Sequence, residues 1–276
     1  MLAAVDSEHA RAPSPDAARR AAIEIDGLAK VYRLGGEKLA ALEDVSLGVR
    51  EGEFVSLVGP SGCGKSTLLN VVAGLVPRSS GRVHVLGDDV TGPSRRIGMM
   101  FQTPVLLPWR TNLDNVLLPV EVFDLDRRRF ASRARDLLQL VGLAAFAERY
   151  PRELSGGMQQ RVAICRMLLT DPAILLMDEP FSALDEMTRE FMNLELLRIW
   201  EALSSTVLFV THNIGEAVFL SDRVVVMSAR PGRIARIVPV DLPRPRTKAT
   251  LSSDAFFHQV TAIRKVFDET GAWNAS

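Results

Sequence analysis

The most constraining feature of this sequence is a glycine-rich loop set between an apolar segment and a short helical pattern. Residues 59–67 are Gly-Pro-Ser-Gly-Cys-Gly-Lys-Ser-Thr, a full match to GxxxxGK[ST]. A predicted strand, Phe54–Val58, precedes the loop, and an apolar helix, Leu68–Val72, follows it. Glycines let the backbone wrap tightly, so that successive N–H groups and the positive end of the helix face an anion. This context predicts a phosphate-binding loop rather than a chance glycine turn.

The side chains of this loop have distinct expected roles. Lys65 can reach the β- and γ-phosphates of a nucleotide, and the Ser66 hydroxyl can ligate Mg²⁺. Cys63 lies near the helix start and Lys65, both of which favour the thiolate, so we expect a maleimide to modify it and bound nucleotide to protect it. The residues expected to bind nucleotide are Gly59, Pro60, Ser61, Gly62, Cys63, Gly64, Lys65, Ser66 and Thr67.

A second motif is an apolar strand that ends in two acids. Residues 174–180 are Ile-Leu-Leu-Met-Asp-Glu-Pro, and ligands of α/β sheets bind beyond the carboxyl ends of their strands. Asp178 is expected to hold Mg²⁺, and Glu179 to polarise an attacking water. Two adjacent acids after a strand usually mark only a strand end that faces solvent. Their interpretation as catalytic and metal-binding residues therefore depends on the presence of the phosphate loop.

A third motif, Leu-Ser-Gly-Gly-Met-Gln-Gln-Arg at residues 154–161, opens a predicted helix. Ser155 is a good N-cap residue, and Val162–Leu169 can continue the helix until Asp171-Pro172 ends it. Two glycines at a helix start expose N–H donors, which makes a second anion site. Such a cap is most often only a turn, and it gains weight from the other two motifs.

Composition narrows the class of protein. The 276 residues suffice for one large domain or two modest ones, and 33 basic residues balance 33 acidic ones. The charge balance therefore favours no nucleic-acid partner. Two cysteines without CxxC spacing exclude a disulfide framework. No apolar run approaches the roughly eighteen residues of a membrane span, and the N-terminus lacks a secretory pattern. We expect a soluble chain that reaches a membrane only through a partner.

From Ile23 onward, short apolar strands alternate with helical patterns, which predicts a parallel sheet with crossover helices. Residues 1–21 lack periodicity and are expected to form a disordered tail. The predicted strands are Phe54–Val58, Arg82–Val85, Ile97–Phe101, Ala173–Met177, Thr206–Val210 and Arg223–Ser228.

The middle of the chain predicts a helical insertion. Strand patterns vanish between about residues 104 and 159, where Arg127–Leu140 and the stretch near Phe146 have helical patterns. Asp241–Arg246 is interpreted as a Pro/Arg linker, and Ser253–Thr270 as a terminal helix. There is no internal repeat.

With the phosphate loop, the LSGG segment and the LLMDEP segment in this order, the sequence resembles an ABC transporter ATPase over about residues 22–240. The resemblance implies an α/β P-loop NTPase with a RecA-like core, a helical subdomain inserted at about residues 104–159, and a C-terminal linker and helix over 241–276. It implies hydrolysis of Mg-ATP by a head-to-tail dimer. Two ATP molecules would lie between the subunits, with Ser155, Gly156 and Gly157 facing the γ-phosphate held by the other copy.

Other positions match the family pattern. Gln102 resembles the Q-loop glutamine that touches Mg²⁺ or the attacking water, and His212 resembles the switch histidine that hydrogen-bonds the γ-phosphate. Ser182–Asp185 resembles the D-loop at the dimer interface. Tyr32 resembles the aromatic residue that stacks on adenine, although a tyrosine near a strand end is often only packing. The resemblance thus implies Glu179, His212, Lys65 and Gln102 as catalytic residues, and Ser66, Gln102 and Asp178 as Mg²⁺ ligands.

Departures from the general pattern point to a subfamily. Met158 stands where the family usually has Gln, and Asn213 follows His212 where Asp is commoner. Met at that position is a familiar variant among importers of nitrate, sulfonates and taurine. The segments 105–110 and 228–234 also resemble the corresponding segments of that subfamily. The implied partners are integral membrane permease subunits and a separate solute-binding protein. The implied location is the cytoplasmic side of the inner membrane, as a peripheral subunit.

Leu106, Leu107 and Trp109 form an apolar cluster just after Gln102. Either the cluster packs into the core, or it forms an exposed groove for a short helix of the permease.

Two other functions fit this sequence less well than that of an importer ATPase. ATPases of translation or DNA repair usually carry tandem cassettes or long coiled coils, and this chain has one phosphate loop and no long heptad run. A P-loop kinase has no use for the LSGG segment. The sequence does not name the transported solute, which this subunit need never touch.

Overall fold

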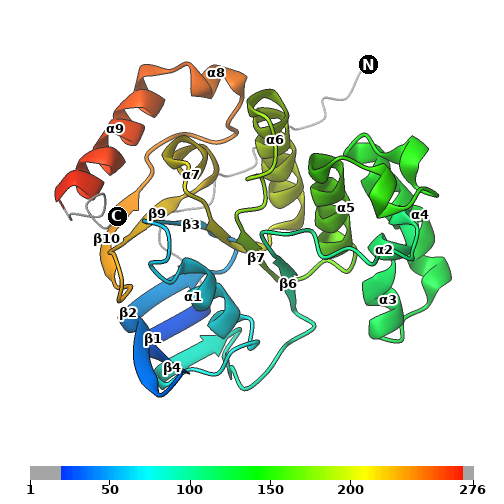
Figure 1. Ribbon diagram of the computed structural model, residues 1–276. Coiled ribbons are helices and arrows are strands. Elements are labelled where there is room, and N and C mark those ends of the chain that lie inside the picture. Colours follow the sequence, from blue (N-terminus) through cyan, green and yellow to red (C-terminus); the bar gives the residue numbers. More distant parts are fainter. Residues whose placement is uncertain (1–19, 270–276) are drawn as a thin grey trace, which may run out of the picture.

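The computed structural model describes residues 20–269, which form two sheets with helices around them (Figure 1). The tail predicted over residues 1–21 lies outside the described residues apart from Arg20 and Ala21. Strand β1 (Ala21–Leu34) begins at once.

The central sheet has six strands in the order β10-β9-β3-β8-β7-β6. Its parallel strands pair β3 with β8 and β9, and β7 with β6 and β8, whereas β10 runs antiparallel to β9 at one edge. Every residue of β3, β7 and β8 is buried, as expected for parallel strands covered on both faces. The bounds are β3 (Phe54–Val58), β6 (Ile97–Met100), β7 (Ile174–Asp178), β8 (Thr206–Val210), β9 (Arg223–Met227) and β10 (Ile234–Pro239).

Alternating side chains of these strands face two separate cores. Val55 and Leu57 of β3 lie in a core with the second sheet and helix α1 (Lys65–Val72). Phe54 and Val58 of the same strand lie in a core with the helices on the other face. The period of two that strand geometry imposes therefore divides the apolar residues between the two layers.

The second sheet is antiparallel, in the order β2-β1-β4-β5. The sequence patterns predicted only one of its strands, Arg82–Val85, and assigned it to the parallel sheet; this assignment was wrong, because the strand pairs antiparallel with β1. A Gly35-Gly36 turn, with φ of 58° and 92°, joins β1 to β2 (Glu37–Arg50). The first strand also pairs with β4 (Ser80–Val85), which continues to β5 (Asp88–Asp89). Buried and exposed residues alternate along the end of β2, so one face of this sheet meets solvent.

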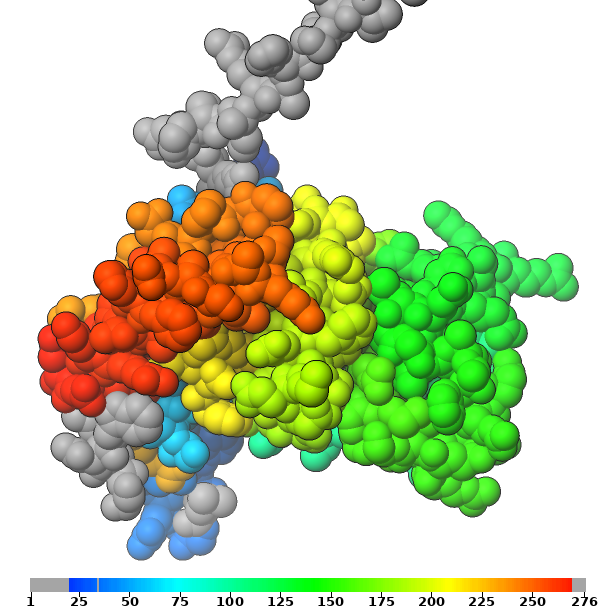
Figure 2. Space-filling view, turned by 90° about the horizontal axis from the view of Figure 1, so that it is seen from above, coloured from blue at the N-terminus to red at the C-terminus, as the bar shows by residue number. Residues whose placement is uncertain are grey.

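Between β6 and β7 the described chain contains helices and loops only. These helices form a lobe on one side of the core, and the C-terminal helices lie on the other side (Figures 1 and 2). The lobe contains α2 (Asn112–Val116), α3 (Leu118–Val122), α4 (Arg127–Leu140), the 3₁₀ turns Ala144–Phe146 and Pro151–Glu153, and α5 (Gly156–Leu168). The remaining helices are α6 (Glu186–Leu203), α7 (Ile214–Leu220), α8 (Lys248–Leu251) and α9 (Asp254–Glu269).

Two features of the described chain bear on the sequence predictions. None of the helices within residues 20–269 is both long and apolar enough to cross a membrane. The segment Asp241–Arg246, predicted as a linker, is packed against the core, and Arg246 within it is only 5% exposed. The segment does join β10 to α8, and the sequence pattern did not show that Arg246 within it would be buried.

A buried carboxylate anchors the start of β3. Glu53 accepts hydrogen bonds from Arg223 Nε at 2.5 Å, from Arg223 Nη2 at 2.9 Å and from the Arg50 amide at 2.8 Å. Burial alone would raise the pKa of Glu53, but these hydrogen bonds and the positive charges of Arg223 and Arg50 lower it overall. The folded state therefore gains from this carboxylate at neutral pH, and the gain is lost as the pH falls through the lowered pKa.

We expect Arg223→Met to lower the free energy of unfolding by about 3–5 kcal/mol, because it leaves the Glu53 carboxylate buried without its ion-pair partner. The matched control is Arg50→Met, which removes an exposed guanidinium 3.5 Å from the same carboxylate and is expected to cost about 1 kcal/mol or less. Denaturant unfolding of both variants measures the difference. Equal losses would contradict the anchoring role of Arg223.

Candidate nucleotide-hydrolysis site

The central sheet brings four predicted site segments to one edge. The phosphate loop follows β3, His212 follows β8, Asp178 and Glu179 end β7, and Gln102 follows β6. These four strands are consecutive neighbours and run in the same direction. Their carboxyl ends therefore lie side by side, which is where α/β sheets bind ligands.

Glycines shape the phosphate loop at two positions. Gly64 has a φ of 102° and forms the N-cap of α1, and a side chain there would come within 2.7 Å of the Ala41 carbonyl oxygen. Gly62 has a φ of 73°. Both conformations disfavour residues with a Cβ, so the glycines of the motif are required by the turn itself.

Lys65 is buried beneath the loop. Its Nζ donates to the carbonyl oxygens of Gly59 at 2.8 Å and Pro60 at 2.9 Å, which folds the side chain back across the turn. No acidic residue lies in the first turn of α1, so its positive end faces the loop without a compensating carboxylate on the helix. The loop therefore combines a helix terminus with an ammonium group, both of which favour an anion.

Cys63 differs from its sequence-based prediction. The thiol is 1% exposed, and burial raises its pKa, an effect that the nearby positive charge of Lys65 opposes but does not overcome. The expectation that the helix start and Lys65 would favour the thiolate was therefore wrong. The sequence showed the charges but not the burial of the sulfur beneath the loop.

The acid pair at the end of β7 has two different environments. Burial and the neighbouring charge of Glu179 raise the pKa of Asp178, and a hydrogen bond to Ser66 and the charge of Lys65 only partly offset this effect. Glu179 has a φ of 47°, a left-handed conformation that is uncommon for residues other than glycine. Strained backbone of this kind concentrates at functional sites, where the surrounding structure holds it in place.

Glu179 and His212 are in contact. Nδ1 of His212 lies 3.2 Å from Oε2 of Glu179, and the imidazole is 60% exposed. Because Nδ1 faces the carboxylate, Nε2 remains available to a ligand above the sheet edge.

The chemistry of the donors fits a magnesium ion. Ser66 lies in the first turn of α1 and Asp178 ends β7, so both oxygen donors belong to the edge that carries the phosphate loop. Burial is the main cause of the raised pKa of Asp178, and Ser66 and Lys65 partly offset it. Oxygen donors from one or two residues, completed by water and phosphate, are typical of Mg²⁺ sites at nucleotides. The side chain of Gln102, the third predicted ligand, is exposed on the loop after β6.

Helix α5 connects the LSGG segment with Gln102. Ser155 caps the helix by accepting from the Met158 amide at 3.3 Å. Farther along, Gln160 donates to the backbone oxygen of Gln102 at 3.1 Å, and Arg166 donates to those of Pro104 and Val105, both at 2.8 Å. Sequence reasoning missed Gln160 and Arg166, because nothing in the pattern of a helix shows which loop its polar residues contact.

Ser155, Gly156 and Gly157 lie apart from the phosphate loop of the same chain. Ser155 and Gly156 are exposed, and within the described residues no hydrogen bond joins these three residues to residues 59–67. Gly157 packs against the segment 182–185, because a side chain there would approach Leu184 Cδ2 to 2.6 Å. Met158 packs partly into the core, which gives this departure from the family pattern a structural role.

Tyr32 lies on β1 opposite Leu39 of β2, and its ring is 4.8 Å from Lys30 Nζ. The next residues of β2 adjoin the loop, since Gly64 faces Ala41 and Leu42. Tyr32 is therefore on the strand pair that borders the phosphate loop, and its predicted stacking on adenine stays a prediction.

The apolar cluster after Gln102 is divided between the core and the surface. Leu106 packs against the large core, whereas Trp109 is 71% exposed and Val105 is 56% exposed. The backbone at Leu107 is fixed by the buried Asn115, which accepts from its amide at 2.7 Å and donates to its carbonyl at 3.0 Å. The core-packing alternative thus holds for Leu106 and not for Trp109.

A further residue lies at the rim of the phosphate loop. Arg230, in the turn between β9 and β10, donates from Nε to the Gly62 carbonyl at 3.2 Å. The neighbouring Gly232 packs on the loop so closely that a side chain there would overlap the Cys63 carbonyl. The sequence did not connect this turn to the loop, because the two are far apart along the chain.

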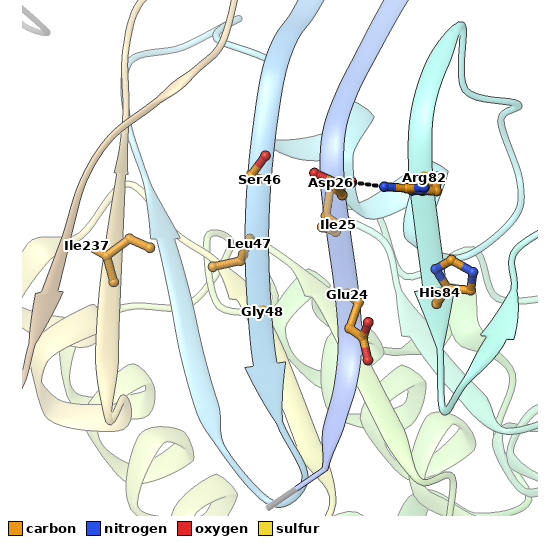
Figure 3. A pocket seen from close by; sticks show the side chains of 9 residues that line it. All are labelled: Glu24, Ile25, Asp26, Ser46, Leu47, Gly48, Arg82, His84 and Ile237. Carbon is orange, nitrogen blue, oxygen red and sulfur yellow. Dashed lines mark hydrogen bonds and ion pairs between the residues drawn. The ribbon is translucent and has the colours of Figure 1, made fainter. Parts of the chain in front are cut away.

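A hollow of about 800 Å³ lies elsewhere, on the solvent face of the antiparallel sheet (Figure 3). Glu24, Asp26, Arg82 and His84 line it from β1 and β4, with an exposed ion pair between Arg82 and Asp26 at 2.6 Å. None of the predicted site residues lines this hollow.

Comparison with known proteins decides the family. The family model described as ABC transporter matches residues 42–182. This chain belongs to the ABC transporter family. It is 47% identical to an uncharacterized ABC transporter ATP-binding protein of Methanocaldococcus jannaschii over 88% of this chain and 91% of that protein. It is 42% identical to the aliphatic sulfonates import ATP-binding protein SsuB of Bacillus cereus, covering 83% of this chain and 90% of SsuB.

Solved structures agree with the family assignment. A dimeric ATP-binding cassette in a post-hydrolysis state, bound to ADP and Pi, matches 80% of this chain and all of that chain, with a TM-score of 0.73 and 35% identity. The fold class predicted from the motifs, an α/β P-loop NTPase, is confirmed, and the chain is an ATPase. The roles of the individual site residues stay predictions.

We expect both thiols to react slowly with maleimide at neutral pH in the folded protein, because each is buried. Burial raises the pKa of Cys63 above its usual value and raises the pKa of Cys165 to about 12. Raising the pH should accelerate labelling of Cys63 before that of Cys165, since only the thiolate reacts. Denatured protein, the control, should take up two equivalents at pH 7. Labelling of folded Cys63 at the rate of a free thiol would contradict its burial.

Proposed function

We propose that this chain is the ATP-hydrolysing subunit of an importer, and that two copies enclose two Mg-ATP molecules to drive uptake of a small anion through permease subunits. The observation that carries the proposal is the alignment of four adjacent strand ends, which gathers the phosphate loop, His212, the acid pair and Gln102 at one edge.

The contacts support a division of labour among the site residues. Loop amides and Lys65 bind the phosphates of ATP, while Ser66, Asp178 and Gln102 hold the metal. Mg²⁺, when bound, supplies neutralisation of charge on the phosphates. Glu179 orients the attacking water and accepts a proton from it. His212, whose Nδ1 lies beside Glu179, contacts the γ-phosphate through Nε2. With both ring nitrogens protonated, Nδ1 donates to Glu179 and Nε2 donates to the γ-phosphate, which stabilises its developing charge.

The position of the LSGG segment supports a dimer. Ser155 and Gly156 are exposed and make no hydrogen bond to the phosphate loop among the described residues, so a second anion site faces outward from each subunit. Matched cassettes in solved structures are dimeric. A head-to-tail pair of this chain would bring the helix start of one copy to the ATP of the other.

The exposed Trp109 supports a membrane partner. A largely exposed tryptophan on a loop whose backbone is fixed by Asn115 and Arg166 is a preformed apolar contact. Its loop begins at Gln102, so docking of a permease helix would connect with the nucleotide site. Such a subunit is peripheral, on the cytoplasmic side of the inner membrane.

The solute class comes from the relatives. One relative is named for import of aliphatic sulfonates, and Met158 fits the subfamily of nitrate, sulfonate and taurine importers that the sequence resembles. We therefore propose a small oxyanion or sulfonate, delivered by a separate solute-binding protein. Uptake of labelled sulfonates by cells with and without this gene would test this assignment.

We expect Glu179→Gln to lower the ATP hydrolysis rate by roughly 10²–10⁴-fold, the usual effect of losing a general base, with ATP binding retained. Unhydrolysed ATP should then hold the pair closed. Size-exclusion chromatography with light scattering should show a dimer with Mg-ATP and a monomer with ADP, and adding Ser155→Arg should abolish the dimer.

The matched control is Glu201→Gln, which changes an exposed carboxylate near the end of α6 and should leave hydrolysis unchanged. Hydrolysis by Glu179→Gln at the wild-type rate would overturn the assignment of the base. A dimer that survives Ser155→Arg would overturn the head-to-tail arrangement.

We expect Trp109→Asp to leave hydrolysis by the isolated subunit unchanged and to release the subunit from its permease, because a carboxylate would be desolvated in an apolar groove. Affinity purification from detergent-solubilised membranes, with mass spectrometry of the co-purified proteins, measures the loss. Phe257→Asp, a change at a 55% exposed aromatic on α9, is the control. Full recovery of permease with Trp109→Asp would refute the docking role.

A further inference from the structure

The last carbonyl groups of α7 are bound by two arginines of the C-terminal segment. Nη1 of Arg246 donates to the backbone oxygens of Val218, Phe219 and Ser221, at 3.0, 2.9 and 2.8 Å. Nη2 of Arg244 donates to that of Leu220 at 2.8 Å. Four successive carbonyl groups at the end of the helix thus find their partners in a segment that follows two strands later.

Physical chemistry explains why arginine occupies these positions. The final carbonyls of a helix have no partners within it and carry its partial negative charge. A guanidinium presents several donors in a rigid plane and offsets that charge. Arg246 is 5% exposed, and burial lowers its pKa to about 10, so it is still a cation at neutral pH.

Arg244 connects this contact to the rest of the core. Its Nε and Nη2 donate to Oδ1 of Asp222 at 3.0 and 2.8 Å, and its guanidinium lies 4.1 Å from the Trp200 ring centroid. The other carboxylate oxygen of Asp222 accepts from the Phe54 amide at 2.9 Å, at the start of β3. The C-terminal segment is therefore fixed to the sheet as well as to α7.

Helix α9 covers the flank of α7. Phe256, Val260 and Ile263 lie in the same core as Ile214 and Val218. The tip of the Phe256 ring is 3.7 Å from the position that a Cβ on Gly215 would take. In Figure 1 the orange and red segment curls over α7, and in Figure 2 it covers this side of the molecule.

The opposite end of α7 begins at the candidate site. Asn213 caps the helix by accepting from the Glu216 amide at 3.0 Å, and its own amide donates to Thr211 Oγ1 at 3.0 Å. His212 lies between these two residues and contacts Glu179. With only seven residues, α7 leaves little length in which a displacement could be absorbed.

We propose that Arg246, assisted by Arg244, is a positioning residue for ATP hydrolysis: by holding the carboxyl end of α7, the C-terminal segment sets the place of His212 against Glu179. The inference rests on the proposed role of His212. It assigns to residues 240–269 a part in catalysis without contact with ATP. Release of the segment would slow the chemical step and leave the phosphate loop unchanged.

The test compares turnover with ATP affinity. Arg246→Met should lower kcat about tenfold or more, since small misplacements of catalytic groups cost that much, while KM for ATP stays within about twofold. Arg246→Lys should restore part of kcat, because an ammonium can bind some of the carbonyls. Arg264→Met removes an exposed arginine of α9 and should leave both constants unchanged.

One further measurement and two further variants keep the outcome decisive. Hydrogen exchange at the α7 amides should accelerate in Arg246→Met and not in Arg264→Met. Arg244→Met, at a less buried side chain, gives the same comparison if Arg246→Met does not fold. His212→Ala is the reference for complete loss of the switch residue.

Different failures point to different errors. Full activity of His212→Ala would contradict the proposed catalytic role of His212. An inactive His212→Ala together with unchanged kcat in Arg246→Met and Arg244→Met would overturn the positioning role alone. A rise in KM that accounts for the whole loss of kcat/KM would also overturn it, since it would show damage to ATP binding.

Discussion

Parallel pairing of β3, β8, β7 and β6 is the constraint on which the candidate site depends. Each strand is a short, mostly apolar run that is followed by a polar segment, and β3, β7 and β8 are buried at every residue. Because the strands run in one direction, the polar segments that follow them lie at the same edge of the sheet. Burial of apolar surface thus brings together a loop, two carboxylates, an amide and an imidazole that are far apart in sequence. The ion pair of Glu53 with Arg223 fixes the first of these strands at its start.

Two helices contact segments at this edge: α7 begins there, and α5 of the helical lobe contacts the loop of Gln102. Helix α5 starts at Ser155 and holds the loop of Gln102 through Gln160 and Arg166. Helix α7 starts beside His212 and is held by Arg246 at its other end. Both arrangements place a side chain by hydrogen bonds to backbone oxygens, which have fixed positions. We propose that docking of a permease affects the site through α5, which holds the loop of Gln102. We propose that the C-terminal segment affects the site through α7.

Sequence patterns predicted the five parallel strands of the central sheet to within one or two residues and α4 at both ends, because continuous apolar runs and a 3.6-residue period are local signals. They did not predict β10, the antiparallel strand at the edge of this sheet. They missed the antiparallel sheet, whose pairing of β1 with β4 joins distant residues. The motifs placed Lys65, Asp178 and Glu179, since a strand fixes where its next residues emerge. They could not show the burial of Cys63 or the contacts of Arg246, which depend on packing between segments far apart in the chain.

We propose that each ATP is bound by the phosphate loop of one copy and the helix start of the other. A structure of the Glu179→Gln protein with Mg-ATP measures this directly. Our account predicts the γ-phosphate within hydrogen-bonding distance of Lys65 and His212 of one subunit and of Ser155 Oγ of its partner. A γ-phosphate that contacts the residues of a single subunit, with Ser155 of both copies facing solvent, would contradict it.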